Sequence, residues 1–244
     1  NQKQTKFWNT WKHRNTYTAA IKSAGAPMGF ITEEDNFADY PFIVAPAYQL
    51  IDQKLVGKWQ KYVENGGNLI LSCRTGQKDK NGHFFEANWS APIVPLIGAD
   101  LEFFDMLVTD VNGTIKAGDK TYQWNTWADV LKPKAGTEVL ATYEDQFYKG
   151  KAAAVTRKLG KGSITYVGVE SINGDFERQI VRTIYDRANV TIEDLPKGVF
   201  VEWRDGFYVG VNYTSEAINL PIPKGSKIVV GQNPLQPAQA VIWK

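Results

Sequence analysis

The sequence predicts an α/β domain, in which helices cover both faces of a parallel sheet, followed by a small all-β domain. Two observations carry this prediction. Residues 42–76 have the pattern of a strand, a helix and a strand, which is the βαβ unit that joins parallel strands. After residue 197 the chain alternates apolar and polar residues, as strands with one solvated face do. We place the α/β domain at residues 1–190 and the β domain at residues 197–244.

The βαβ unit carries the clearest local signals. Asp52 is placed to cap the helix, and Gly66 and Gly67 follow as its end. The apolar run 68–73, NLILSC, is typical of a parallel strand that is covered on both faces. The helix presents five apolar side chains on one face, at helical spacing: Leu55, Val56, Trp59, Tyr62 and Val63.

The remaining segments complete the predicted order. Residues 11–24 have helical spacing, and the apolar run 26–32 suits a buried strand. Residues 77–92 form a long polar and aromatic loop. Residues 99–169 indicate strands and turns, with a Gly-Lys-Gly hairpin signal, and residues 175–188 are helical and close the first domain.

Composition excludes several classes of function. The 28 basic and 26 acidic residues are scattered and give a net charge of +2, so neither nucleic acid nor a membrane surface is indicated as a partner. One cysteine and two histidines exclude an internal disulfide and offer no metal cluster, and we expect no cofactor. The first residue is Asn rather than Met, which fits a processed product or a piece of a longer chain. The compartment, cytoplasm or periplasm, stays open.

Four stretches together resemble a known family. They are YPFIVAPAYQLID, YVENGGNLILSCRTG, FYKGKAAAVTRKLGKGSITYVGV and LPKGVFVEWRDGFYVGVNY. In this order they are similar to the non-barrel part of family 42 β-galactosidases, and the resemblance covers roughly residues 11–244. It implies a flavodoxin-like or class I glutamine-amidotransferase-like trimerisation domain and a C-terminal β domain, with a catalytic (β/α)8 barrel of the same polypeptide and a homo-trimer as partners. Nothing before Trp11 has the pattern of a strand, which leaves open whether a first sheet strand is missing.

The resemblance predicts a non-catalytic role. A (β/α)8 barrel takes about 250 residues, so this chain cannot also contain one. We therefore expect an oligomerisation and accessory region of a β-galactosidase, which joins subunits and walls the approach to active sites on the absent barrel. No catalytic residue is predicted, because Glu86, Glu102, Asp105 and Glu170 have no glycosidase motif around them.

A free-standing amidotransferase-like hydrolase is the first alternative. Its nucleophile would be Cys73, which follows a strand in the position that such folds use. The turn lacks small residues on both sides of the cysteine, and the two possible bases, His13 and His83, are predicted to lie on the surface. We therefore interpret Cys73 as a small, half-buried residue at a strand end.

The candidates for an interface or a substrate rim are Arg74, Trp89, Trp124 and Trp127. The guanidinium of Arg74 suits a carboxylate or carbonyl partner, and bracing of the loop 77–92 is the alternative. Tryptophans in irregular polar segments mark interfaces, although their indole faces also suit sugars, so a carbohydrate-binding module is the second alternative. Trp203 and Trp243 are predicted to fill the core of the β domain.

Overall fold

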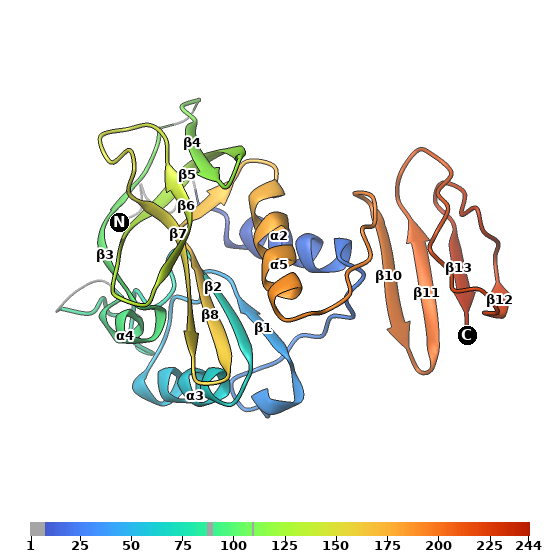
Figure 1. Cartoon of the computed structure of the whole chain (residues 1–244), viewed down its shortest axis with the longest axis horizontal. Helices are drawn as coiled ribbons and strands as arrows, with labels where there is room; N and C mark the ends of the chain where they lie inside the picture. Colours follow the sequence, from blue (N-terminus) through green and yellow to red (C-terminus); the bar gives the residue numbers. More distant parts are fainter. Residues whose placement is uncertain (1–7, 87–89, 109) are drawn as a thin grey trace. The chain divides into compact units, whose positions relative to one another are not determined.

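The computed structural model describes residues 8–86, 90–108 and 110–244 (Figure 1). By its contacts the chain divides into two units. Unit 1 comprises residues 1–15 and 32–177, and unit 2 comprises residues 16–31 and 178–244. The two units are described separately below, and the domain limits 1–190 and 197–244 stay a prediction.

Unit 1 is built on a nine-stranded sheet in the order β1-β2-β8-β7-β6-β4-β5-β3, with β9 paired to β5. The strands are β1 (Phe42–Ala45), β2 (Asn68–Ser72), β3 (Ala99–Asp105), β4 (Gly113–Ala117), β5 (Lys120–Pro133), β6 (Glu138–Tyr143), β7 (Ala152–Leu159), β8 (Gly162–Val167) and β9 (Val169–Ser171).

The predicted βαβ unit is confirmed. Strands β1 and β2 are parallel, and helix α3 (Gln53–Glu64) connects them. The Asp52 carboxylate accepts a hydrogen bond from the backbone N–H of Leu55 at 2.7 Å, which caps the helix. All five predicted apolar positions of this helix are buried. Strand β8 then adds to β2, also in parallel.

The predicted fold class is wrong. Beyond β8 the pairings of the sheet are antiparallel, and β7, β6, β4 and β5 pair in a ring that closes through Leu131 and Ala152. Unit 1 is therefore a mixed sheet with a closed antiparallel barrel, and neither a flavodoxin-like nor an amidotransferase-like parallel sheet. The physical reason is the connections: a tight hairpin joins β7 to β8, whereas parallel neighbours need a crossover of a dozen or more residues.

Short helices complete the unit. The connection before β3 comprises η2 (Ala91–Ile93) and α4 (Val94–Ile97), and η1 (Phe37–Asp39) precedes β1.

The predicted first and last helices are confirmed as α2 (Thr10–Ser23) and α5 (Asp175–Arg187), each of which runs from one unit into the other. The strand predicted at residues 26–32 is wrong, because this segment has no regular structure.

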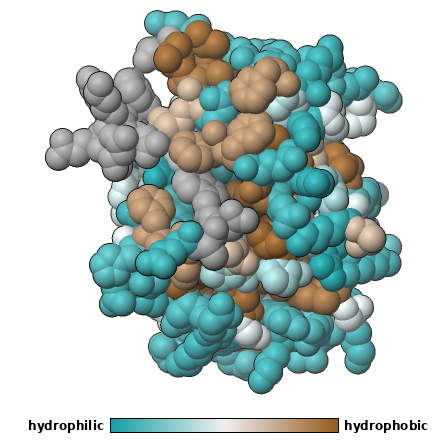
Figure 2. Space-filling view, turned by 90° about the vertical axis from the view of Figure 1, so that its left-hand side faces the viewer, coloured by the Kyte–Doolittle hydropathy of each residue, from teal (hydrophilic) through white to brown (hydrophobic). Residues whose placement is uncertain are grey.

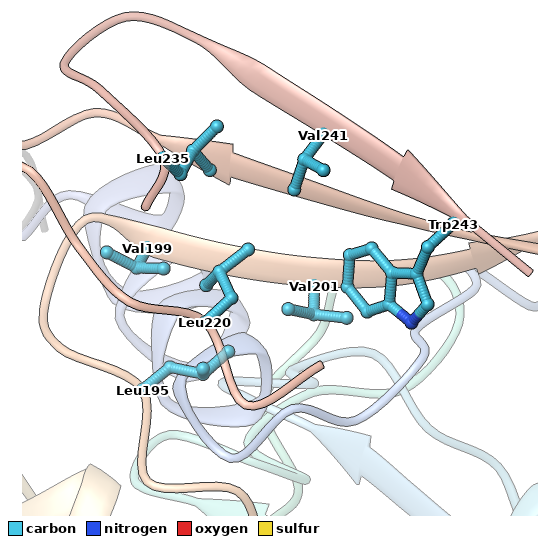
Figure 3. Close-up of a cluster of buried hydrophobic side chains, with 7 residues drawn as sticks. All are labelled: Leu195, Val199, Val201, Leu220, Leu235, Val241 and Trp243. Atoms are coloured by element: carbon cyan, nitrogen blue, oxygen red, sulfur yellow. The ribbon is translucent and has the colours of Figure 1, made fainter. Parts of the chain in front are cut away.

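Unit 2 contains a four-stranded antiparallel sheet in the order β10-β11-β13-β12. Its strands are β10 (Val199–Arg204), β11 (Phe207–Asn212), β12 (Ile228–Val230) and β13 (Ala240–Trp243). Figure 3 shows its core, to which loops contribute as well as strands: Leu195, Val199, Val201, Leu220, Leu235, Val241 and Trp243. Trp243 is buried as predicted, whereas the prediction for Trp203 is wrong, since half of its surface is exposed.

Candidate functional site

The turn after β2 is the centre of the candidate site. Arg74 has a φ of 68°, in the left-handed region that non-glycine residues rarely adopt. Its backbone N–H donates to Asp129 Oδ2 at 3.1 Å, and the Thr75 hydroxyl donates to the Ser72 carbonyl at 2.6 Å. The strained residue of this turn is thus Arg74, one position after the cysteine that the sequence draws attention to.

Asp129 on β5 accepts hydrogen bonds from three residues around the turn. Its buried carboxylate accepts hydrogen bonds from Trp127 Nε1 at 2.9 Å and from the Tyr166 hydroxyl at 2.7 Å, besides the Arg74 N–H. Burial raises the pKa of Asp129 to about 6, and the hydrogen bonds from Tyr166 and Trp127 oppose that shift. Asp129 is not among the residues predicted for a site, although an acid within the apolar run WADVL is a signal for a paired buried charge.

The side chain of Arg74 lies in an aromatic cage, which we define as Trp8, Trp127 and Phe104. The guanidinium carbon is 4.9 Å from the ring centroid of Trp8 and 4.6 Å from that of Trp127. Phe104 stacks on the Trp127 ring at 4.7 Å, with an angle of 2° between the planes. Arg74 is only 8% exposed, and the loss of water lowers its pKa.

Two nitrogens of the guanidinium are left without a partner in the described part of the chain. Arg74 Nε and Nη1 are both buried, and neither has a hydrogen-bond acceptor among the described residues. Neither donor therefore forms a hydrogen bond that would brace the described residues of the loop 77–92. A buried polar group without a partner is costly, so this cage is the least satisfied polar feature of the turn.

His13 is deeply buried next to the same turn, and the prediction that it lies on the surface is wrong. It belongs to α2, and its Nε2 is 2.7 Å from the Ser72 hydroxyl oxygen. Its Nδ1 is 3.7 Å from Glu170 Oε2. This order of serine, histidine and acid resembles a catalytic triad, but all three residues are buried and the Ala47 N–H already donates to the Ser72 hydroxyl oxygen at 2.8 Å. The arrangement therefore packs the start of α2, which belongs to unit 1, against the end of β2.

Cys73 is fully buried rather than half-buried. Burial raises the pKa of its thiol well above the usual value, and the charges of Asp129 and Glu170 act in the same direction. A catalytic cysteine needs a thiolate and an accessible position. His83 matches its prediction, since it lies on the surface with 79% of its side chain exposed.

The four predicted interface residues do not form one group. Arg74 and Trp127 meet in the aromatic cage, whereas Trp124 is wholly buried and packs edge-on against Tyr143 in the barrel. Trp89 lies outside the described residues. Roles for these residues at an interface or a substrate rim stay predictions.

Three of the four acids considered for catalysis, all except Glu86, have other partners. Glu102 pairs with Lys151 at 2.8 Å, Asp105 accepts from the Tyr148 hydroxyl at 2.7 Å, and Glu170 pairs with Lys12 at 3.4 Å. In the described residues, no group of three or more potential ligands is arranged to hold a metal ion. Within the same residues, none of the helices has the length and apolarity that a membrane crossing requires.

Comparisons with known proteins agree with one another. The family model described as "Beta-galactosidase trimerisation domain" matches residues 1–191. β-Galactosidase BgaH of Haloferax lucentense is 30% identical over 227 residues, which are 93% of this chain and 34% of the relative. β-Galactosidase Bga of Halorubrum lacusprofundi is 28% identical over 223 residues, which are 86% of this chain and 32% of the relative.

Solved structures share the fold. A polyextremophilic β-galactosidase from Halorubrum lacusprofundi superimposes with a TM-score of 0.88 at 25% identity, over 97% of this chain and 36% of the other. For a β-galactosidase from Bacillus circulans the TM-score is 0.86 at 19% identity, over 97% of this chain and 37% of the other, which shows the fold alone. The chain thus spans about a third of the length of the proteins that it matches.

The Cys73 thiol should react very slowly in the folded chain. Its burial and raised pKa both suppress the thiolate, so we expect alkylation by iodoacetamide at pH 7.5 to be at least about 100-fold slower than in 8 M urea. Mass spectrometry of timed samples measures both rates. Fast labelling of the folded chain would contradict the assignment of Cys73 as a structural residue.

Asp129 should make stability fall as the pH rises from 4 to 6. Its pKa is about 6 in the folded chain and about 4 when unfolded. Between these values only the folded chain binds the proton, so the free energy of unfolding decreases with pH. Relative to Asp129→Asn, the wild type should gain about 1 kcal/mol on going from pH 8 to pH 5. Urea titrations measure this, with Asp119→Asn, at an exposed turn, as the control that shows no such difference.

Proposed function

This chain belongs to the β-galactosidase trimerisation domain family, and from that membership we propose that it joins the subunits of a β-galactosidase. The observation that carries the proposal is the family match over residues 1–191, together with relatives that are named β-galactosidases and are about three times as long. The chain would be an accessory region of such an enzyme, without catalytic residues of its own.

The proposed assembly is a homo-trimer, in which each chain is attached to a catalytic (β/α)8 barrel of the same polypeptide. The two domains of this proposal keep the predicted limits, residues 1–190 and residues 197–244, as parts of a longer protein. In a cyclic trimer each interface joins two different surface patches. Each patch should contain apolar area that is exposed in the single chain.

One such patch lies at the edge strand β3, and we call it the β3 patch: Phe103 and Phe147. Phe147 in the β6–β7 turn is 84% exposed and stacks on Phe103 of β3 at 5.5 Å, with an angle of 15° between the rings. Figure 2, which views the side where β3 lies in Figure 1, shows hydrophobic side chains gathered on this face. Two stacked phenylalanines at a sheet edge are suited to burial against a second subunit.

Replacement of Phe147 by aspartate should weaken the trimer. An aromatic residue at the centre of an interface typically contributes enough that its loss lowers the association constant about 30-fold. Sedimentation velocity over a range of protein concentrations measures this. Phe30→Asp is the matched control, because Phe30 is 89% exposed and lies outside the β3 patch. If both variants lose association to the same extent, or if neither loses it, the β3 patch is not the interface.

A carbohydrate-binding role has one observation in its favour. Trp203 and Tyr208 are directly opposite each other on β10 and β11, with exposed fractions of 50% and 45%. Tyr208 also stacks on Trp243 at 5.4 Å, nearly in parallel. Flat exposed aromatic faces suit the apolar face of a sugar ring, so this pair is the second candidate function.

Saturation-transfer NMR with methyl β-galactoside tests that candidate. We expect transfer to the sugar ring protons, with millimolar affinity, and its loss in Trp203→Ala because the stacking face is removed. Trp11→Ala removes another exposed indole, which is 73% exposed, and should leave the signal unchanged. Absence of transfer to the wild-type chain would eliminate the carbohydrate-binding role.

A further inference from the structure

Arg74 is held in a fixed position by three independent contacts. Its backbone is locked by the bond to Asp129 and by the left-handed φ, and its side chain is flanked by Trp8 and Trp127. Such a side chain loses little further conformational entropy when a ligand binds, which is the general advantage of preorganisation. The cage therefore has the properties of a binding site that is already formed.

Among the described residues no acceptor meets Nε or Nη1 of the guanidinium, although the negative charge of nearby Asp129 partly compensates the charge of Arg74. The nearby carboxylate of Asp129 accepts from the backbone of Arg74, from Trp127 and from Tyr166, and the guanidinium is not among its donors. Arginine has five N–H donors, and two of its nitrogens here are buried without acceptors in the described residues. The aromatic rings stabilise the cation but do not accept these in-plane N–H groups.

The chemistry of the site selects its ligand. A planar, permanently charged guanidinium favours a carboxylate, which offers two acceptor oxygens and the opposite charge. A neutral carbonyl could accept these hydrogen bonds, but in a largely dehydrated cage it would add no negative charge to that of Asp129, whereas a carboxylate would. A carboxylate therefore suits the two unpaired donors best.

We propose that the Arg74 cage receives an aspartate or glutamate carboxylate from a second copy of this chain. The cage is continuous with the β3 edge, because Phe104 of the cage follows Phe103 of the β3 patch, and the partly buried Met106 packs against the same cluster. Successive strand residues point to opposite faces, so the two sites lie on different sides of β3. A cyclic trimer needs two different patches of this kind. The inference rests on the proposed trimer and assigns its second patch.

The test compares the stability of the chain with its association. In Arg74→Met the buried charge and its unpaired N–H donors are lost, while an unbranched, shorter apolar side chain remains to pack against the two indoles. We expect the melting temperature of the dilute, monomeric chain to stay the same or rise, and the trimer association constant to fall at least 30-fold. Arg157→Met is the control: Arg157 donates to the Pro95 carbonyl at 3.1 Å within the chain, so its loss should leave association unchanged.

Carbodiimide coupling identifies the acid that binds in the cage. In Arg74→Lys the lysine amine should form an amide bond with the carboxylate of the neighbouring chain. Mass spectrometry of tryptic peptides from the trimer should then find a cross-link between residue 74 of one chain and an acidic residue of another. A link formed only within one chain would overturn the proposal. A melting temperature that falls in Arg74→Met while association is unchanged would also overturn it, since Arg74 would then be scaffolding.

The outcome separates this inference from the proposed function. If Arg74→Met forms trimers with unchanged affinity, the proposed function stands and the proposed role of the Arg74 cage is overturned. A wild-type chain that stays monomeric at 200 μM loses both, because no second copy then supplies the carboxylate. If Arg74→Met weakens association only in a longer protein that contains a catalytic barrel, the carboxylate does not come from a second copy of this chain, and the proposal is overturned.

Discussion

The buried carboxylate of Asp129 is the interaction on which the rest of the site depends. It lies on the long strand β5 and reaches across the sheet to the turn after β2, where it accepts the backbone N–H of Arg74. The same carboxylate holds the indole of Trp127 and the hydroxyl of Tyr166. Three donors compensate much of the cost of burying one charge. Removal of this acceptor would leave all three donors unpaired at once.

The barrel explains why Asp129 can reach that turn. At Gly168 a Cβ atom would lie 2.5 Å from the Asp129 carbonyl oxygen, so only glycine allows the two strands to approach this closely. The Asp129 N–H donates to the Gly168 carbonyl at 2.7 Å, and the Tyr143 hydroxyl donates to the Asp129 carbonyl at 2.9 Å. Besides the β7–β8 hairpin, the hydrogen bond from Asp129 to Gly168 connects the barrel strand β5 to the end of β8, next to the site.

The local elements could be predicted from the sequence, because their causes are local. The Asp52 cap and the apolar stripe of α3 need only neighbours in the sequence, and both are found as predicted. The closure of the barrel through Leu131 and Ala152 depends on residues far apart in the chain, and no local pattern reports it. The resemblance to a family with an amidotransferase-like sheet favours the wrong fold class as well, because it extends the parallel pairing of one βαβ segment to all strands of unit 1.

The site was predicted only in part, for a related reason. Arg74 and Trp127 can be identified from residue type, but their meeting depends on Asp129, and the run WADVL indicates a paired buried charge without indicating its partners. His13 lies in a polar stretch, KHRNT, and burial of one face of α2 carries it to the Ser72 hydroxyl. The helix has weak amphipathic character, so its sequence does not reveal which face is buried.

The β3 patch and the Arg74 cage would have different tasks in an assembly. Apolar contact between Phe103, Phe147 and another subunit supplies affinity, but it tolerates shifts in register because it has no direction. An arginine fixed by a strained backbone and two indoles accepts a carboxylate in one position only. Contacts with the wrong neighbour would leave the two buried N–H donors of Arg74 without acceptors, which penalises such contacts. The cage would thus select the arrangement of subunits whose binding energy the β3 patch provides.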